Sequence, residues 1–183
     1  MQTFIQRISK DHKNRLFCHE TKRFQTLFHL STQIFMAGII IRNIHASEME
    51  KAYELVRELA IYEKEEEAFT IGIEEYDEQF KQGLFQILVA VDQDDIIGMA
   101  LFYPTFSTWK GKMMYLEDFV VKEAYRRKGA GQLLFDAFIE TSKAQNCKLV
   151  KWQVLDWNEP AINFYKKNKA TLEDEWLSCK IFL

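Results

Sequence analysis

The sequence predicts an α+β protein with a mixed β-sheet. Short apolar runs, typical of strands, alternate with longer segments whose apolar residues recur at helical spacing. Internal repeats and low-complexity tracts are absent from the sequence. With 183 residues, 48% of them hydrophobic, and only 7 Gly and 2 Pro, the chain suits one compact domain with a sizeable core.

The region up to residue 83 predicts one strand followed by two helices. An isoleucine run predicts a strand over 38–43, and apolar residues at helical spacing predict helices over 47–64 and 73–82. Gly83 is placed to end the second helix. The inner face of the first helix is expected to carry Val56, Leu59, Ala60 and Tyr62.

Three strands are predicted next. Apolar runs at 85–91 and 96–103 flank the polar turn 92–95, which predicts a β-hairpin. A further strand is expected over 112–121. Its apolar neighbours indicate a buried strand, in which a charged side chain needs a partner.

The last third of the chain predicts two helices and two strands. A helix after Gly129 has an apolar stripe opposite a charged face. A strand is expected over 148–155, and a helix over 160–167 begins at Asn158 or Glu159 with proline in its first turn. A closing strand is predicted over 177–182.

Charge is unevenly distributed along the chain. Residues 1–35 carry six Lys and Arg against two acidic residues, whereas residues 36–183 carry 18 basic and 25 acidic residues. The acidic body argues against nucleic acid as a partner and suits a cationic substrate. We interpret 1–35 as a basic N-terminal extension, with Met36 as a natural start. An organelle-targeting peptide and an arm that packs on a partner subunit are the alternatives.

Several classes of protein are excluded by composition. The three cysteines show neither C-x-x-C nor metal-ligand spacing, so unpaired thiols in a reducing, cytoplasmic setting are expected. All four histidines precede residue 46, so no candidate motif after that point contains a histidine for a metal site or for a Ser-His or Cys-His nucleophile. Apolar runs are far shorter than the roughly 18–20 residues of a membrane span, so no membrane insertion is expected.

The most informative segment follows the strand at 112–121. It reads R-x-x-G-x-G, from Arg126 to Gly131. Glycine has no Cβ, so backbone N–H groups at Gly129 and Gly131 can approach a pyrophosphate at the positive end of the next helix. The spacing fits neither a P-loop nor the dinucleotide fingerprint, whose third glycine is replaced by Leu134. The segment therefore predicts an anion-binding loop of another kind.

This loop resembles the coenzyme A pyrophosphate signature of the GNAT superfamily of N-acetyltransferases. A second segment, from Asn158 to Tyr165, resembles the N-x-x-A/S-x-x-F/Y-Y pattern of the same superfamily. The chain is more closely similar to the diamine acetyltransferases, which are the spermidine/spermine and thialysine enzymes, at 58–63, 109–112, 115–119 and 157–160. The resemblance covers roughly residues 38–183.

The resemblance implies a GNAT acetyltransferase domain over 36–183. Its expected fold is a mixed, mostly antiparallel twisted sheet with a V-shaped splay between central strands, flanked by about four helices. It also implies acetyl-CoA as the acetyl donor, a small primary amine as the substrate, and a homodimer that pairs through closing strands. The alternative is a protein lysine or N-terminal acetyltransferase, or a module that only senses coenzyme A.

Catalytic roles are carried over from the same motifs. Tyr165 is expected to protonate the departing sulfur, and Glu117 to accept the amine proton with support from Asp118. As neighbours on a strand, these two carboxylates are expected to point to opposite faces. The backbone of the same strand would pair with the pantetheine arm.

The binding residues implied by the resemblance form two sets. Coenzyme A is expected to contact Phe119, Val120, Val121, Arg126, Arg127, Lys128, Gly129, Ala130, Gly131, Gln132, Asn158, Pro160, Ala161, Asn163, Phe164 and Lys167. The amine is expected to contact Tyr62, Glu63, Trp109, Glu117, Asp118, Trp152 and Glu175, with Asp174 as an alternative to Glu175 and with core packing as the alternative for the tryptophans.

Two positions depart from the family pattern. Ser107 stands where polyamine enzymes tend to carry an acid, which leaves shorter amines and thialysine-like amino acids open as substrates. Lys169 stands where the family usually ends a helix with glycine, and Asn168 is expected to supply the left-handed residue instead.

Overall fold

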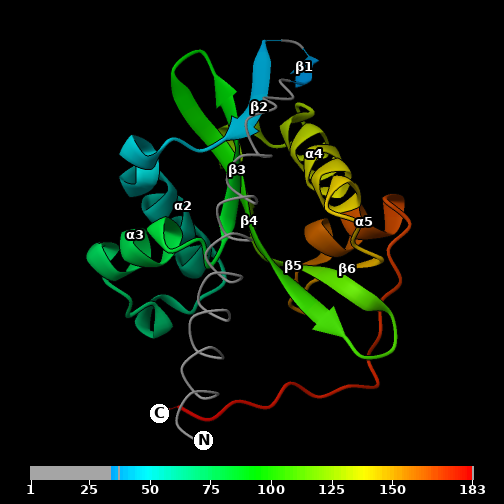
Figure 1. Cartoon of the computed structure of the whole chain (residues 1–183). Coiled ribbons are helices and arrows are strands. Elements are labelled where there is room, and N and C mark those ends of the chain that lie inside the picture. The colour runs from blue at the N-terminus through cyan, green and yellow to red at the C-terminus, as the bar shows by residue number, and fades with distance from the viewer. Residues whose placement is uncertain (1–33, 37, 183) are drawn as a thin grey trace, which may run out of the picture.

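The computed structural model describes residues 34–36 and 38–182. These residues form the predicted α+β fold around one six-stranded sheet, in the order β1-β2-β3-β4-β5-β6 (Figure 1). The predicted extension at 1–35 lies almost wholly outside the described residues. Its last two residues belong to a short edge strand, β1, which the sequence did not indicate.

All pairs of neighbouring strands are antiparallel except β5 and β6, which run parallel. The strands are β1 Ile34–Met36, β2 Ile39–Asn43, β3 Gln86–Asp92, β4 Asp95–Ser107, β5 Gly111–Val121 and β6 Leu149–Lys151. The helices are α2 Met49–Tyr62, α3 Ile73–Lys81, α4 Ala130–Ala144 and α5 Glu159–Lys167, with 3-10 turns η1 Ala46–Glu48, η2 Glu66–Ala68 and η3 Glu123–Tyr125.

The helices bury two separate faces of the sheet (Figure 1). On one face α4 and α5 cover a core that includes Phe102, Leu116 and Phe138. On the other face α2 and α3 cover a core that includes Leu55 and Met99. Because side chains alternate along a strand, the core to which a residue belongs shows the face on which it lies.

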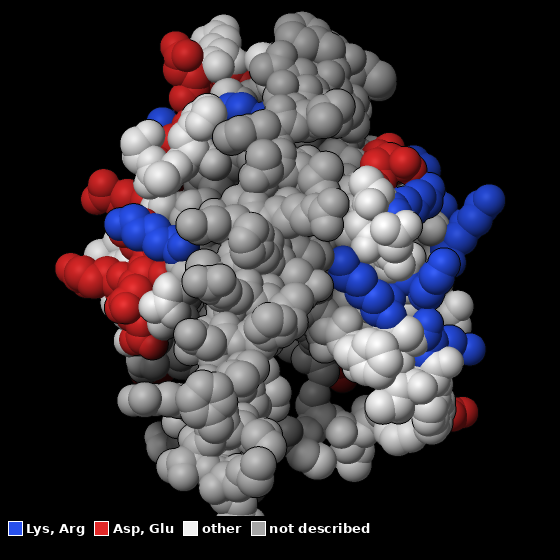
Figure 2. Space-filling view, in the orientation of Figure 1, with Lys and Arg blue, Asp and Glu red and all other residues white. Residues whose placement is uncertain are grey.

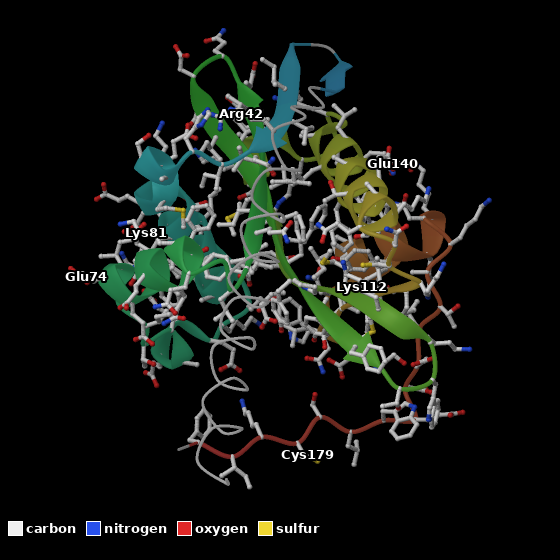
Figure 3. The ribbon with its side chains drawn as sticks, in the orientation of Figure 1. Arg42, Glu74, Lys81, Lys112, Glu140 and Cys179 are labelled. Atoms are coloured by element: carbon white, nitrogen blue, oxygen red, sulfur yellow. The ribbon has the colours of Figure 1, made fainter. Side chains whose placement is uncertain are left out.

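The entry to α2 is fixed by an ion pair. The Arg42 guanidinium, on β2, donates to both carboxylate oxygens of Glu48 at 2.7 and 2.8 Å (Figure 3 labels Arg42). This hydrogen bonding, reinforced by the His45 backbone N–H, lowers the pKa of Glu48 to about 2 in spite of partial burial. The start of α2 is thereby attached to the sheet.

Strand β6 is shorter than the predicted 148–155. Residues Leu149–Lys151 of β6 pair with Met113–Tyr115 of β5. Beyond this point β5 continues to Val121 without a partner in β6, and this is the V-shaped splay of the sheet. Rings occupy the α5 side of this opening: the centroid of Tyr165 lies 4.9 Å from that of Trp152 and 6.5 Å from that of Phe119. Strand β6 therefore ends at Lys151, where the splay begins.

The predicted closing strand over 177–182 is wrong for the described chain. These residues pair with no strand that the structure describes, and the tail runs below the sheet, where Cys179 is labelled (Figures 1 and 3). Its Ser178 hydroxyl accepts a hydrogen bond from the Gln153 side chain, just after β6. Leu177 is 90% exposed and Ile181 is 88% exposed. A strand needs a ladder of backbone hydrogen bonds to a neighbouring edge, and the described residues of the tail form none.

The left-handed residue after α5 is Lys169, with φ of 64°, and not Asn168, with φ of −85°. The Asn168 side chain donates to the carbonyl of Phe164 at 2.9 Å and exchanges hydrogen bonds with Gln132 on α4. These contacts keep Asn168 at the helix end, so the reversal falls one residue later.

Candidate active site

The predicted anion loop connects η3 to α4. Arg127 and Gly129 both have positive φ, 62° and 94°, and this alternation turns successive N–H groups toward one side. The first backbone hydrogen bond of α4 runs from the Leu133 N–H to the carbonyl of Gly129. The N–H groups of the first turn therefore lack intrahelical partners. A Cβ added at Gly129 would meet nothing within 4 Å, and the loop is therefore open to a ligand.

Positive charge surrounds the loop. Arg126, Arg127 and Lys128 are exposed, and the exposed Lys166 and Lys167 stand on α5. Figure 2 shows Lys and Arg gathered on the α4–α5 side of the molecule and Asp and Glu gathered on the α2–α3 side. The two sides therefore differ in the charge of the ligand that they attract.

A β-bulge in β5 changes the predicted orientation of the two candidate carboxylates. Leu101 of β4 pairs with Asp118 and Phe102 pairs with Leu116, so Glu117 is the extra residue. Leu116 belongs to the α4 face, while Leu101, the partner of Asp118, belongs to the α2–α3 face. The expectation that Glu117 and Asp118 point to opposite faces is therefore wrong, since the bulge turns both toward α2 and α3.

Glu117 is exposed and held by a tyrosine. The Tyr103 hydroxyl, on β4, donates to its Oε2 at 2.6 Å. Burial and this carboxylate raise the pKa of Tyr103 above its usual range. The bond fixes the Glu117 side chain on the α2–α3 face of the sheet.

Asp118 lies deeper but stays partly accessible. Burial, followed by the charges of Glu117 and Glu63, raises its pKa to about 7. Glu63 is the C-cap of α2, and its own pKa is raised by burial and by Glu65. The helix end and the bulge thus bring three carboxylates into one electrostatic neighbourhood.

Two tyrosines of this neighbourhood were not predicted from the sequence. Tyr103 could have been found by extending the β4–β5 hairpin register, which places it opposite Tyr115. Tyr76, on α3, has a buried hydroxyl with no hydrogen-bond partner among the described residues. Burial and the charge of Asp118 raise its pKa. No local pattern in the sequence would have placed it there.

Tyr165 is buried on α5 among the aromatic rings of the splay. Burial, followed by the charge of Glu63, raises its pKa to about 12, so its hydroxyl stays protonated at neutral pH. That hydroxyl has no hydrogen bond to any residue the structure describes. A protonated, unengaged phenol suits a proton donor.

The N-terminus of α5 is capped by Asn158, whose Oδ1 accepts from the Ala161 N–H at 3.3 Å. The same oxygen accepts from the Tyr62 hydroxyl at 3.3 Å. The predicted substrate residue Tyr62 therefore contacts the start of α5.

Three other predicted substrate residues lie apart from the carboxylates. Trp109 is 84% exposed in the β4–β5 turn, where Ser107 Oγ accepts the Trp109 N–H. Glu175 is exposed in the tail, as is its alternative Asp174. Trp152 is half-buried against Phe135 and Tyr165, an environment typical of core packing.

The part of the chain that the structure describes holds no group of three or more His, Cys, Asp or Glu arranged to bind a metal ion. Of its helices, none is long and apolar enough to cross a membrane.

The model of the family described as "Acetyltransferase (GNAT) family" matches residues 49–169. This chain belongs to that family and is an acetyltransferase.

Individual relatives and solved structures agree with this assignment. Thialysine N-epsilon-acetyltransferase of Bos taurus is 33% identical over 141 residues, covering 72% of this chain and 83% of the bovine protein. L-ornithine N5-acetyltransferase of Arabidopsis thaliana is 38% identical over 87 residues, covering 47% of this chain and 38% of that protein. An aminoglycoside acetyltransferase from an uncultured soil metagenomic sample shares the fold, with a TM-score of 0.69, 20% identity, and coverage of 80% and 97% of the two chains.

Proposed function

We propose that this protein transfers the acetyl group of acetyl-CoA to a primary amine of a small cationic molecule, by direct attack in a ternary complex. The carrying observation is the β5 bulge, which turns Glu117 and Asp118 to one face beside Glu63. Three neighbouring carboxylates suit an ammonium group. Relatives named for thialysine, ornithine and spermidine/spermine support diamines, polyamines and thialysine-like amino acids as the substrate class.

Coenzyme A fits the loop from Arg126 to Gly131. The unpaired N–H groups at the start of α4 would hold its pyrophosphate, and the exposed basic side chains would offset its charge. A Cβ added at Gly131 would approach only Val121 Cγ2, at 3.7 Å, so the protein itself does not require glycine there. Close approach of a ligand would require it. Acetyl-CoA supplies the activated acetyl thioester.

The proton transfers are assigned to groups on different elements. Glu117 takes the proton of the incoming ammonium, directly or through water, so that the nitrogen can bond to the acetyl carbon. Asp118 and Glu63 hold the cation. Tyr165 gives a proton to the sulfur as the carbon–sulfur bond breaks, and its raised pKa keeps that proton available at neutral pH.

We also propose a homodimer and a cytoplasmic location. The exposed apolar tail at 176–182 supports pairing with a second copy of the chain. Cys147 and Cys179 are free thiols, which supports a reducing compartment.

Turnover of acetyl-CoA with a panel of amines tests the proposed activity. The panel contains diamines, polyamines, ornithine, thialysine, a monoamine and a lysine peptide. We expect turnover of one of the small amines, and Tyr165→Phe should lower kcat about 100-fold with acetyl-CoA binding retained. Turnover of the peptide alone would favour a protein acetyltransferase, and the absence of coenzyme A binding would refute the proposal.

The pH dependence of Glu117→Gln completes this test. The variant keeps the shape of the side chain but accepts no proton, so its loss should be largest near neutral pH, where few amine molecules are deprotonated. Raising the pH toward 9.5 should restore part of the rate with the monoamine. An equal loss at both pH values would remove Glu117 from the base role and transfer it to Asp118.

A further inference from the structure

Tyr62 lies where three segments of the active site meet. It ends α2, immediately before Glu63. Its ring lies beneath the Arg126 guanidinium, 4.9 Å from the guanidinium carbon to the ring centroid. Its hydroxyl donates to Asn158 Oδ1 at 3.3 Å. One side chain at the end of α2 therefore contacts both the Arg126–Gly131 loop and the start of α5.

The contact with Asn158 bears on the candidate acid. Asn158 caps α5, and Tyr165 follows it by seven residues, which is two helical turns along the same face. Both hydrogen bonds to Asn158 Oδ1 are 3.3 Å, which is long for their kind, so a small movement of Tyr62 changes how firmly the cap is held. The cap in turn sets the position of the phenol.

The contact with Arg126 bears on the cofactor. Arg126 Nε donates to the carbonyl of Val121 at 3.0 Å, which anchors the guanidinium between the end of β5 and the Tyr62 ring. An anion held by the loop attracts this same guanidinium. Occupancy of the loop would therefore change the packing of Tyr62 against the guanidinium.

Trp157 supports the junction from the α5 side. Its ring centroid lies 6.0 Å from that of Tyr62, and Lys64 Nζ lies 5.1 Å from the Trp157 ring centroid. Tyr62 and Lys64, at the end of α2, thus both contact Trp157 at the start of α5. Of these two residues, Tyr62 also contacts Arg126.

We propose that Tyr62 is a positioning residue that couples occupancy of the Arg126–Gly131 loop to the placement of Tyr165 and Glu63. The inference rests on the proposed function. Binding at the loop orders the Arg126–Tyr62–Asn158 chain, which sets the acid on α5 and the carboxylate at the end of α2. By reciprocity, coenzyme A then raises the affinity for the amine, and the amine raises the affinity for coenzyme A by the same factor.

Two substitutions at Tyr62 separate its two contacts. Tyr62→Phe keeps the ring under Arg126 and removes the bond to Asn158, so kcat should fall about 3- to 10-fold with little change in coenzyme A affinity. Tyr62→Leu removes both contacts, so coenzyme A affinity should also weaken about 2- to 5-fold. In Tyr62→Leu the enhancement of amine binding by coenzyme A should disappear.

The matched control is Tyr53→Phe. Tyr53 is also on α2, and its hydroxyl donates to the carbonyl of Ile71 at 2.9 Å, on the side of α3. This variant should lower the melting temperature and leave kcat and coupling unchanged. Titration calorimetry of the best amine, with and without coenzyme A, together with the kcat and KM of each variant, gives the readout.

A simple lining role in the amine channel predicts a different result. In that case both Tyr62 variants would raise the amine KM alone, with kcat, coenzyme A affinity and coupling as in the wild type, and the proposal would be overturned. Equal behaviour of Tyr62→Phe and Tyr53→Phe would overturn it as well. If the wild-type chain binds no coenzyme A, the proposed function itself fails, which is a distinct outcome.

Discussion

The extra residue in β5 determines where the charge of the active site lies. Without the bulge at Glu117, strict alternation would place Glu117 and Asp118 on opposite faces. With the bulge, both carboxylates face α2 and α3. Asp118 is then largely surrounded by protein, and burial together with the charges of Glu117 and Glu63 raises its pKa to about 7. The protein therefore carries an acid that is costly to ionise, and the proposed cationic substrate would reduce that cost.

This cost predicts the effect of Asp118→Asn on stability. The carboxyl has a higher pKa in the folded chain than in the unfolded chain, so wild-type stability should fall as pH rises from about 4 to about 7 and then level off. The variant lacks this penalty. We expect it to be more stable than the wild type by on the order of 1–3 kcal/mol at pH 8 in urea denaturation, because partial access to water reduces the full shift.

The comparison at pH 5 provides the check. The advantage of Asp118→Asn should shrink at pH 5, since most of the native carboxyl is then protonated. Asp94→Asn, on an exposed turn residue, removes the same charge and should show no such dependence. A variant at Asp118 that is less stable than the wild type at pH 8 would contradict the environment described for this residue.

At the scale of elements, the sequence predicts most of the helices and strands but not their irregularities. Alternation and helical periodicity located α2 to α5 and β2 to β5 to within a few residues, since both patterns are local. The bulge at Glu117 and the early end of β6 depend on packing between strands and α5, which no local pattern encodes. The loop proposed to bind coenzyme A stands out in the sequence because its glycines and charges are consecutive, whereas Tyr76 and Tyr103 join the candidate site only through tertiary contacts.

The end of α5 supplies a prediction of its own. Lys169 adopts a left-handed conformation, which costs a residue with a Cβ about 1 kcal/mol, and the Ala170 N–H donates to the carbonyl of Tyr165 at 3.0 Å to close the helix. Lys169→Gly should therefore stabilise the protein by about 0.5–1 kcal/mol relative to Lys169→Ala, which loses the same charge but keeps the Cβ. Equal midpoints of urea unfolding for the two variants would show that the backbone is not strained there.

For the molecule as a whole, the separation of charge matches the two proposed ligands. The α4–α5 side gathers Lys and Arg, and the α2–α3 side gathers Asp and Glu (Figure 2). An anionic cofactor and a cationic amine would thus approach from differently charged sides and meet at the splay between β5 and β6. The net charge of −3 conceals this division.

The C-terminal tail carries the last prediction, on the assembly of the whole molecule. Trp176, Leu177, Ile181 and Phe182 are all at least 70% exposed, and each would contribute roughly 1.5–3 kcal/mol if it were fully buried. Ordering the tail costs about 1–2 kcal/mol per residue in backbone entropy, so apolar burial alone does not fix it, and backbone pairing with a second copy would supply the remainder. We expect the full chain to sediment as a dimer.

Truncation after Glu175 should convert that dimer to a monomer in analytical ultracentrifugation. Cys179→Ser, on the same tail, should leave the dimer intact, because it changes neither the apolar residues nor the backbone. Leu177→Asp should weaken the dimer and shift its dissociation to higher protein concentration, since burial of that carboxylate is unfavourable. A truncated chain that still sediments as a dimer would place the contact between subunits elsewhere, and a full chain that sediments as a monomer would leave the tail free in solution.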